Sequence, residues 1–414
     1  MRRSSLSLAL VLSLSTSLLF AADAPKLEER SAQPSYILSN ADVEVAVTKT
    51  GGHMTATFAR AGDKPIAPYH VSPWQTEGLK IDPPILRILR GDFFCLPFGG
   101  NADAVNGEQH PPHGETANGE WTFAETMNEH NVHGLKLTLT SKVRPGSIDK
   151  LLWVVDGQPV IYTSHVVSGF AGPSPVAHHA NLAMPANEGV IRVSTSPIRF
   201  GITNPNRFSD PAKQENQALA INAKFTDLSK VPKLDSAATP ADCSRMPQPK
   251  GYADFFGVVN KEPAAGDETP AWVAAVNTEA NTLWFAIKDA RVLPMTYFWI
   301  ENGGRGASPW NGRNNCLGLE DACSYFADGL APSVAENLLT KEGVKTAITF
   351  KSDAPTTINY IQGAVRVPAG FDRVASVAFT DQTATFKSDS GREVVVPVSN
   401  EFLRFGKKAF PQPQ

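Results

Sequence analysis

The hydrophobic and polar positions of this chain form many short runs in which apolar and polar residues alternate. Residues 43–48 read Val-Glu-Val-Ala-Val-Thr, and residues 135–140 read Leu-Lys-Leu-Thr-Leu-Thr. A period of two places every second side chain on one face of a β-strand. We expect further strands in the other apolar or alternating runs, which are residues 54–60, 151–155, 160–167, 190–193, 219–221, 272–276, 282–287, 347–350, 374–378 and 393–398.

Helical periodicity is scarce, and we expect only one short helix, over residues 335–340. The 32 prolines and 31 glycines are scattered along the chain, as in proteins whose many strands are joined by turns. Residues 203–218 and 228–250 are polar and are expected to be loops. The pattern therefore predicts an all-β, mainly antiparallel protein, with a sandwich favoured over a barrel.

The domain organisation follows from the same pattern. Residues 25–36 are polar and are expected to form a flexible lead-in to a single domain over residues 37–414. The strands from about residue 359 are expected to complete the same sandwich, because no linker-like stretch separates them from the rest. A small extra β unit in this tail is the alternative.

The N-terminus has the pattern of a signal peptide. Arg2 and Arg3 precede an apolar run over residues 6–20, which is followed by Ala-Ala-Asp-Ala at residues 21–24. A positive n-region, an apolar h-region and small residues at the cleavage site are typical of an export signal. We expect residues 1–24 to be removed and the protein to be periplasmic or secreted. No later apolar stretch is long enough for stable membrane insertion.

Charge and cysteine content narrow the possible partners. The formal net charge is −3, and no basic patch indicates a nucleic-acid partner. The four cysteines, Cys95, Cys243, Cys316 and Cys323, allow three complete disulfide pairings, among which the sequence does not choose. Their spacing contains no Cys-x-x-Cys pair of the kind that holds zinc or does redox work. The oligomeric state is not indicated by the sequence.

The first stretch with candidate chemistry is a polar loop between two apolar runs, within residues 92–121. His110 and His113 flank Pro111 and Pro112, and Gly114 follows. Two prolines disfavour a helix, so the histidines do not stack one turn apart, and a metal pair is disfavoured. Gly114 allows the backbone to turn sharply, which helps to fix the side chain of His113.

Two further stretches carry polar residues on strand-like runs. Residues 176–189 contain His178 and His179, and a period of two places His179 on one face with Asn181. We favour His179 as the site residue, with two structural histidines as the alternative.

In residues 316–323, the same period places Glu320 on one face with Cys316 and Gly318, whereas two leucines point to the core. Glu320 is a candidate catalytic carboxylate, and a structural ion pair with Arg313 is the alternative. Trp299 and Trp310 could stack on a sugar, or simply belong to the core.

Taken in order, these motifs resemble the galactose-mutarotase-like superfamily, the aldose 1-epimerases and their uncharacterised relatives. The motifs are His113-Gly114 before a tryptophan-containing strand, His179-Ala-Asn-Leu with Pro185 and Gly189 after it, and Leu317-Gly-Leu-Glu320. The resemblance covers about residues 40–350. The Asn-Arg pair of the aldose 1-epimerases is absent, because Gly99-Gly100-Asn101 has no arginine after it, and Arg90 or Arg87 is the nearest substitute.

The resemblance implies a supersandwich of large antiparallel sheets with a site on a concave face. It implies that Glu320 is the general base at the anomeric hydroxyl of a sugar, that His179 is the general acid at the ring oxygen, and that His113 polarises the same region. Neither metal nor cofactor is implied, and the partner is a sugar or oligosaccharide. Looser candidates for contacts with sugar hydroxyls are Asn181, Asn101, Arg90, Trp310 and His110.

Two other functions fit the same residues. One is a carbohydrate-binding protein that does no chemistry, because one fold can host both tasks. The other is a polysaccharide lyase or hydrolase, which would need a long cleft lined with several aromatic residues and either a second acid or a tyrosine near Glu320, and Tyr297 and Tyr325 are the candidate tyrosines.

Overall fold

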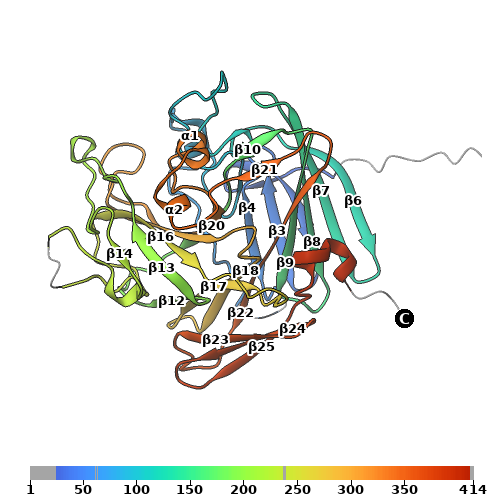
Figure 1. Ribbon diagram of the computed structural model, residues 1–414. Helices are drawn as coiled ribbons and strands as arrows, with labels where there is room; N and C mark the ends of the chain where they lie inside the picture. The colour runs from blue at the N-terminus through green and yellow to red at the C-terminus, as the bar shows by residue number, and fades with distance from the viewer. Residues whose placement is uncertain (1–24, 61, 63, 236–238, 411–414) are drawn as a thin grey trace, which may run out of the picture.

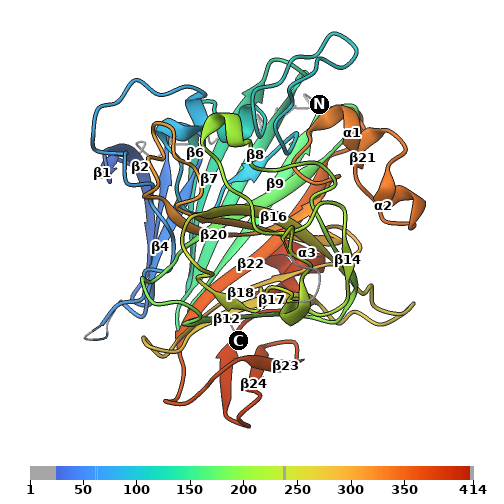
Figure 2. The same cartoon turned by 90° about the vertical axis from the view of Figure 1, so that its left-hand side faces the viewer.

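Two large antiparallel β-sheets that pack face to face form the framework of the described chain (Figures 1 and 2). The computed structural model describes residues 25–60, 62, 64–235 and 239–410. The expected signal peptide over residues 1–24 lies outside these residues. None of the helices in the described ranges is both long and apolar enough to cross a membrane.

The larger sheet has nine strands within the described residues. Their order is β15 (Arg245–Met246), β12 (Ile191–Thr195), β17 (Ala271–Asn277), β18 (Thr282–Lys288), β22 (Thr356–Arg366), β9 (Val160–Ser168), β8 (Gly146–Val155), β7 (Val132–Ser141) and β6 (Thr122–Glu129).

The second sheet has seven strands in the described part of the chain. Their order is β14 (Lys224–Phe225), β13 (Ile198–Thr203), β16 (Tyr252–Asn260), β19 (Met295–Asn302), β20 (Asn315–Cys323), β11 (Val176–Ala183) and β5 (Phe94–Cys95). All the pairings in both sheets are antiparallel. The predicted all-β, antiparallel class is therefore confirmed.

Smaller elements surround these sheets. Three small sheets consist of β1 (Glu28–Arg30), β2 (Gln33–Ser39), β3 (Val43–Thr48) and β4 (Met54–Phe58); of β10 (Gly172–Ser174) and β21 (Ile348–Phe350); and of β23 (Val374–Phe379), β24 (Thr383–Ser388) and β25 (Glu393–Pro397). The short helices are α1 (Leu330–Val334), α2 (Leu338–Lys341), α3 (Phe402–Phe405), η1 (Pro84–Arg87), η2 (Glu115–Ala117), η3 (Pro211–Lys213), η4 (Leu228–Lys230) and η5 (Gly406–Ala409).

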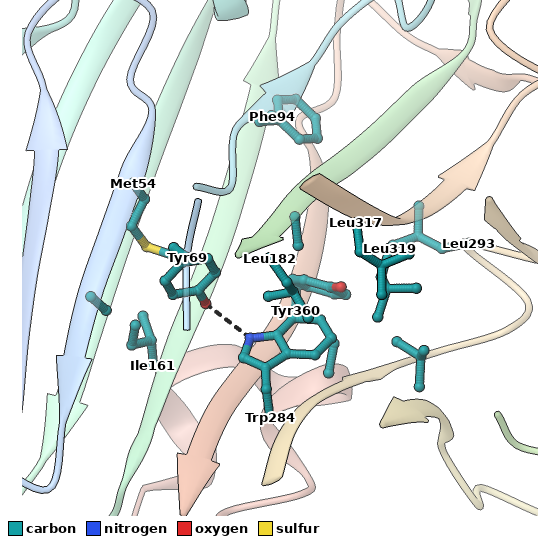
Figure 3. Close-up of a cluster of buried hydrophobic side chains, with 14 of the residues drawn as sticks. Met54, Tyr69, Phe94, Ile161, Leu182, Trp284, Leu293, Leu317, Leu319 and Tyr360 are labelled. Carbon is teal, nitrogen blue, oxygen red and sulfur yellow. Dashed lines mark hydrogen bonds between the residues drawn. The ribbon is translucent and has the colours of Figure 1, made fainter. Parts of the chain in front are cut away.

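The main core lies between the two large sheets. Leu317 and Leu319 of β20 enter it from one side and Trp284 and Tyr360 from the other, as Figure 3 shows. Burial of such side chains contributes about 2–3 kcal/mol each to folding. A second cluster covers the opposite face of the seven-stranded sheet and includes Trp299 and Phe255. The seven-stranded sheet therefore has a buried face on each side.

Two expectations about the chain ends are corrected. Residues 25–36 are not a flexible lead-in, because β1 and most of β2 lie there, and Tyr36 of β2 is buried in the main core. Strand β22 completes the large sheet as expected, but β23–β25 form a separate sheet at the lower end of both views. Its Phe386 packs with Phe285 of β18, so this sheet covers the outer face of the larger one.

Two local expectations are also wrong. Residues 335–340 do not form one helix, because Ala335 has an extended backbone and the Asn337 side chain caps α2 by accepting from the backbone N–H of Leu339. Residues 219–221 are not a strand, and Leu219 makes only an isolated bridge to Lys233. The predicted strand over residues 43–48 matches β3 at both ends.

Candidate functional site

The candidate site lies on the outer face of the seven-stranded sheet, where β11 and β20 pair. His179 is directly opposite Glu320 in this ladder. Nε2 of His179 lies 3.2 Å from Oε1 of Glu320, and both side chains are buried. This distance is within the reach of proton transfer between an acid and a base.

The alternation predicted for both strands is confirmed. His178, the neighbour of His179, points to the opposite side, where its Nδ1 lies 3.1 Å from Oδ2 of Asp92. Leu317 and Leu319 likewise enter the main core. Because the period is two, the ladder that buries these residues must place His179 and Glu320 together on the other face.

Gly318 makes room for the carboxylate. A Cβ atom at this position would lie 2.8 Å from Oε1 of Glu320 and 2.9 Å from Cβ of Trp299. Such contacts are closer than ordinary van der Waals distances, so any side chain here would displace Glu320 or Trp299. The bare backbone of Gly318 therefore helps to set the position of Glu320.

The loop between β5 and β6 brings a third residue to the pair. His113 has a left-handed backbone (φ +61°), and Gly114 follows with φ +78°. A Cβ atom on Gly114 would lie 1.9 Å from the carbonyl oxygen of Leu96, so only glycine fits. The ring of His113 meets that of His179 edge-on, with centroids 5.1 Å apart, and its Nδ1 lies 3.6 Å from Sγ of Cys95.

These three residues line one pocket of about 160 Å³. His179 stacks on the ring of Phe93, with centroids 4.4 Å apart, and Trp299 meets His179 edge-on. Trp310 completes an aromatic side of the pocket. The remaining apolar lining, which we call the apolar wall, comprises Ile85, Leu86, Leu89, Phe93 and Phe255, with Phe208 and Ala327 near it.

Burial determines the protonation of the pair. It raises the pKa of Glu320 well above its usual range and lowers the pKa of His179 well below its usual range, because charged forms lose their hydration. Burial also lowers the pKa of His113 to about 4. Burial therefore favours a neutral carboxylic acid beside a neutral imidazole over the charged pair.

Arg305 is a pocket residue that the sequence patterns did not single out. Its guanidinium lies over the rings of Trp310 and Phe208, at 4.7 and 5.1 Å from their centroids. Its Nε lies 3.4 Å from Oε2 of Glu301, and burial raises the pKa of Glu301 to about 7. In the sequence, Arg305 was indicated as a site residue only by its position in the loop between β19 and β20.

This architecture is similar to that of several solved structures. No protein-family model matches the sequence, and no curated protein matches it. Among solved structures, a protein from Klebsiella pneumoniae that is provisionally named an aldose 1-epimerase superposes with a TM-score of 0.56 at 14% identity, over 82% of each chain. A galactose mutarotase-like protein from Clostridium acetobutylicum superposes with a TM-score of 0.53 at 11% identity, over 82% of this chain and 97% of its own. A galactose mutarotase related enzyme from Lactobacillus acidophilus has a TM-score of 0.52 at 10% identity, over 80% of this chain and 97% of its own.

This chain has the galactose-mutarotase-like fold. At such low identity the likeness establishes the fold alone. The galactose-mutarotase-like fold was expected from the ordered motifs around His113, His179 and Glu320, and that expectation is confirmed.

Four residues expected to contact a sugar lie outside the pocket of this galactose-mutarotase-like chain. Arg90 donates to the carbonyl oxygens of Arg30 and Ser31, so it holds the β1–β2 turn. Asn101 donates to the carbonyl oxygen of Pro97 and accepts from the backbone N–H of Leu330.

His110 and Asn181, the other two residues expected to contact a sugar, also interact with protein groups outside the pocket. Nε2 of His110 lies 3.0 Å from Glu108, and Asn181 donates to the carbonyl oxygen of Gly91. These polar groups stabilise loops and strand ends.

Arg313 and Tyr297, the residues expected as alternative neighbours of Glu320, contact other groups. Arg313 pairs with Glu77 and not with Glu320. The hydroxyl of Tyr297 donates to Ser324 and accepts from the backbone of Phe326. Among the residues that the structure describes, no group of three or more His, Cys, Asp or Glu side chains could hold a metal ion, and the four cysteines have free thiols.

Proposed function

We propose that this protein is a carbohydrate-active protein that interconverts the anomers of a small aldose by acid–base chemistry. The observation that carries the proposal is the buried His179–Glu320 pair at the base of an aromatic pocket. Oε2 of Glu320 and Nδ1 of His179 are buried and have no hydrogen-bond partner among the described residues. Unpaired polar atoms of this kind are suited to a polar ligand. The names of the solved structures that share the fold point to the same reaction.

The proton balance of this pair suits ring opening. In the proposed reaction, transfer of the carboxyl proton from Glu320 to His179 leaves a carboxylate beside an imidazolium. Glu320 then takes the proton of the anomeric hydroxyl, His179 protonates the ring oxygen, and the bond between C1 and the ring oxygen breaks to give an open-chain aldehyde.

The enzyme state that faces the aldehyde is then a neutral acid beside a neutral imidazole. Burial favours this same state in the free protein. After rotation about C1–C2, the reverse transfers close the ring on the other face of the aldehyde. The pair carries one proton throughout, so each cycle ends as it began.

The other residues of the pocket have supporting roles in this proposal. Trp299 and Trp310 offer aromatic surfaces to the C–H groups of a sugar ring. His113, which stays neutral near pH 7, is placed to donate to or accept from an oxygen near the anomeric centre. The pattern of residues 1–24 supports action in the periplasm or outside the cell.

Polarimetry of freshly dissolved α-aldoses tests the proposal, with the chain purified from Pro25 onward. We expect wild type to accelerate mutarotation and Glu320→Gln to lose about 10²-fold or more of that activity, the usual size of a general acid–base contribution. Glu188→Gln, at an exposed position, is the matched control. Failure of wild type to accelerate any aldose contradicts the proposal.

A non-catalytic carbohydrate-binding protein is the second candidate, and the aromatic side of the pocket favours it equally. Calorimetric binding of aldoses without acceleration by wild type identifies this case. A polysaccharide lyase or hydrolase is less well supported, since the pocket of about 160 Å³ is compact and the Tyr297 hydroxyl is engaged by Ser324 and Phe326.

A further inference from the structure

The pocket presents hydrogen-bonding side chains on one side and hydrocarbon on the other. Only His113, His179, Arg305 and Glu320 offer polar side-chain groups besides the indole N–H groups. Nε1 of Trp299 is buried without a partner among the described residues. All other lining side chains, including the whole apolar wall, are hydrocarbon.

The backbone carbonyl oxygens of the apolar wall are also engaged in hydrogen bonds within the protein. The carbonyl oxygen of Leu86 accepts from Nε1 of Trp74 at 2.6 Å, and that of Ile85 accepts from the backbone N–H of Ile88. The carbonyl oxygen of Leu89 accepts from the N–H of Ser72.

The same holds for the two phenylalanines of the apolar wall. The carbonyl oxygen of Phe93 accepts from the N–H of His179, and that of Phe255 accepts from the N–H of Asn204. Each residue of the wall therefore has its carbonyl oxygen engaged, and the side chains that the wall presents are hydrocarbon.

Few hydrogen-bonding groups on the polar side of the pocket remain for an additional hydroxyl of the sugar. In the proposed reaction, Glu320 and His179 serve the anomeric hydroxyl and the ring oxygen. Nε of Arg305 lies 3.4 Å from Glu301 and 3.7 Å from Glu215, and the guanidinium lies against aromatic rings. A sugar hydroxyl pressed against the apolar wall would lose its water and gain no partner, which weakens binding.

We propose that the site prefers a deoxy sugar, a pyranose in which hydrogen replaces one hydroxyl, so that a methyl or methylene group meets the apolar wall. This inference rests on the proposed function of the pocket as a sugar site. A hydrocarbon group gains contacts with Leu86, Leu89 and Phe255 where a hydroxyl would be stranded. In a hydrophobic pocket, a difference of this size changes specificity by about tenfold or more.

Matched pairs of sugars test this preference. The pairs are galactose with 6-deoxygalactose, glucose with 2-deoxyglucose, and mannose with rhamnose of the same series. We expect kcat/KM for mutarotation to be about tenfold higher for the deoxy member of at least one pair. Equal or higher values for the hydroxylated member of every pair overturn the inference while leaving the proposed function intact.

If wild type accelerates no sugar, the proposed reaction fails, and calorimetric binding of the same pairs decides the preference. Tighter binding of a deoxy member then supports it, whereas equal or weaker binding, or none, overturns it.

A substitution in the wall gives an independent test. Leu86 is part-buried, so Leu86→Gln adds a hydrogen-bonding group without burying it fully. We expect the preference for the deoxy sugar to narrow by severalfold. Leu79→Gln, at an exposed position outside the pocket, should leave the ratio unchanged. An unchanged ratio in folded Leu86→Gln contradicts a role for this wall.

Discussion

His179 and Glu320 face each other across the β11–β20 ladder, with Nε2 and Oε1 3.2 Å apart. Their proximity is a property of backbone pairing, because each is the direct partner of the other in the register. A shift of one residue in either strand would send one of the two into the core. The geometry of the pair is thus as stable as the sheet that holds it.

The pH dependence of mutarotation should be bell-shaped and broad. Activity requires one proton on the pair. It should fall at acid pH only below the ordinary histidine value of about 6.5, because the pKa of His179 is lowered, and at alkaline pH only well above the ordinary glutamate value of about 4.5, because the pKa of Glu320 is raised. Rates at constant ionic strength from pH 4 to 9 check this. An acid limb of the pH profile centred at 6.5 or higher would contradict a lowered pKa of His179.

Gly318→Ala should reduce activity more than stability. The added Cβ would lie 2.8 Å from Oε1 of Glu320, so the carboxylate must move, and we expect kcat/KM to fall about tenfold or more. Gly100→Ala is the control, since its Cβ would meet only the carbonyl oxygen of Ala327, at 3.7 Å. Full activity in folded Gly318→Ala would show that the position of Glu320 is not critical.

Stability should decrease as the pH falls, and His53 should account for part of that slope. His53 is fully buried beneath Phe93, and burial lowers its pKa to about 3. Between about pH 6.5 and 3 the unfolded chain therefore binds a proton at this residue that the folded chain does not. We expect His53→Gln to flatten the slope by about 1.4 kcal/mol per pH unit in this window.

Urea unfolding of wild type and His53→Gln at pH 7, 6, 5 and 4 measures this slope. His130→Asn, in the exposed turn between β6 and β7, is the control. Its free energy of unfolding should change with pH in parallel with that of wild type. Parallel curves for His53→Gln and wild type would refute the assignment.

The buried pair of Lys288 and Asp321 should be costly to break on one side only. Nζ of Lys288 lies 2.5 Å from Oδ1 of Asp321 and also donates to Thr296, and neither charged group is exposed. Lys288→Met leaves the carboxylate buried without its cation, and we expect a loss of about 3–5 kcal/mol in the free energy of unfolding.

Denaturant unfolding of Lys288→Met and of the double variant Lys288→Met/Asp321→Asn checks this prediction. The double variant should be more stable than Lys288→Met, because no uncompensated charge remains. The opposite order would mean that the pair is not held as an ion pair.

Most strands and the faces on which His179 and Glu320 lie were predictable, because both depend on local periodicity, whereas the register that pairs the two residues was not. The alternation in residues 43–48 gives β3 directly, and alternation in β11 and β20 correctly separated His179 from His178 and Glu320 from its leucine neighbours. Period two is a local property of the sequence and needs no knowledge of the partner strand.

The remaining contacts depend on long-range packing that no local pattern records. Arg90 and Asn101 look like ligand contacts in sequence, yet both satisfy carbonyl oxygens of neighbouring loops. Arg305 acquires its role only when the loop after β19 meets Phe208, almost a hundred residues earlier. The separate sheet β23–β25 is likewise set by packing on β18 and not by a break in the pattern.

The pocket is built from two kinds of structure, paired strands and the connections between strands, and these can change at different rates in evolution. The acid–base pair stands on paired strands, whereas Ile85 and Leu86 come from η1, and Arg305 and Trp310 come from the connection after β19. Insertions and substitutions in these connections alter the walls without shifting the ladder. Such changes can therefore alter the shape and polarity of the pocket while His179 and Glu320 keep their positions on β11 and β20.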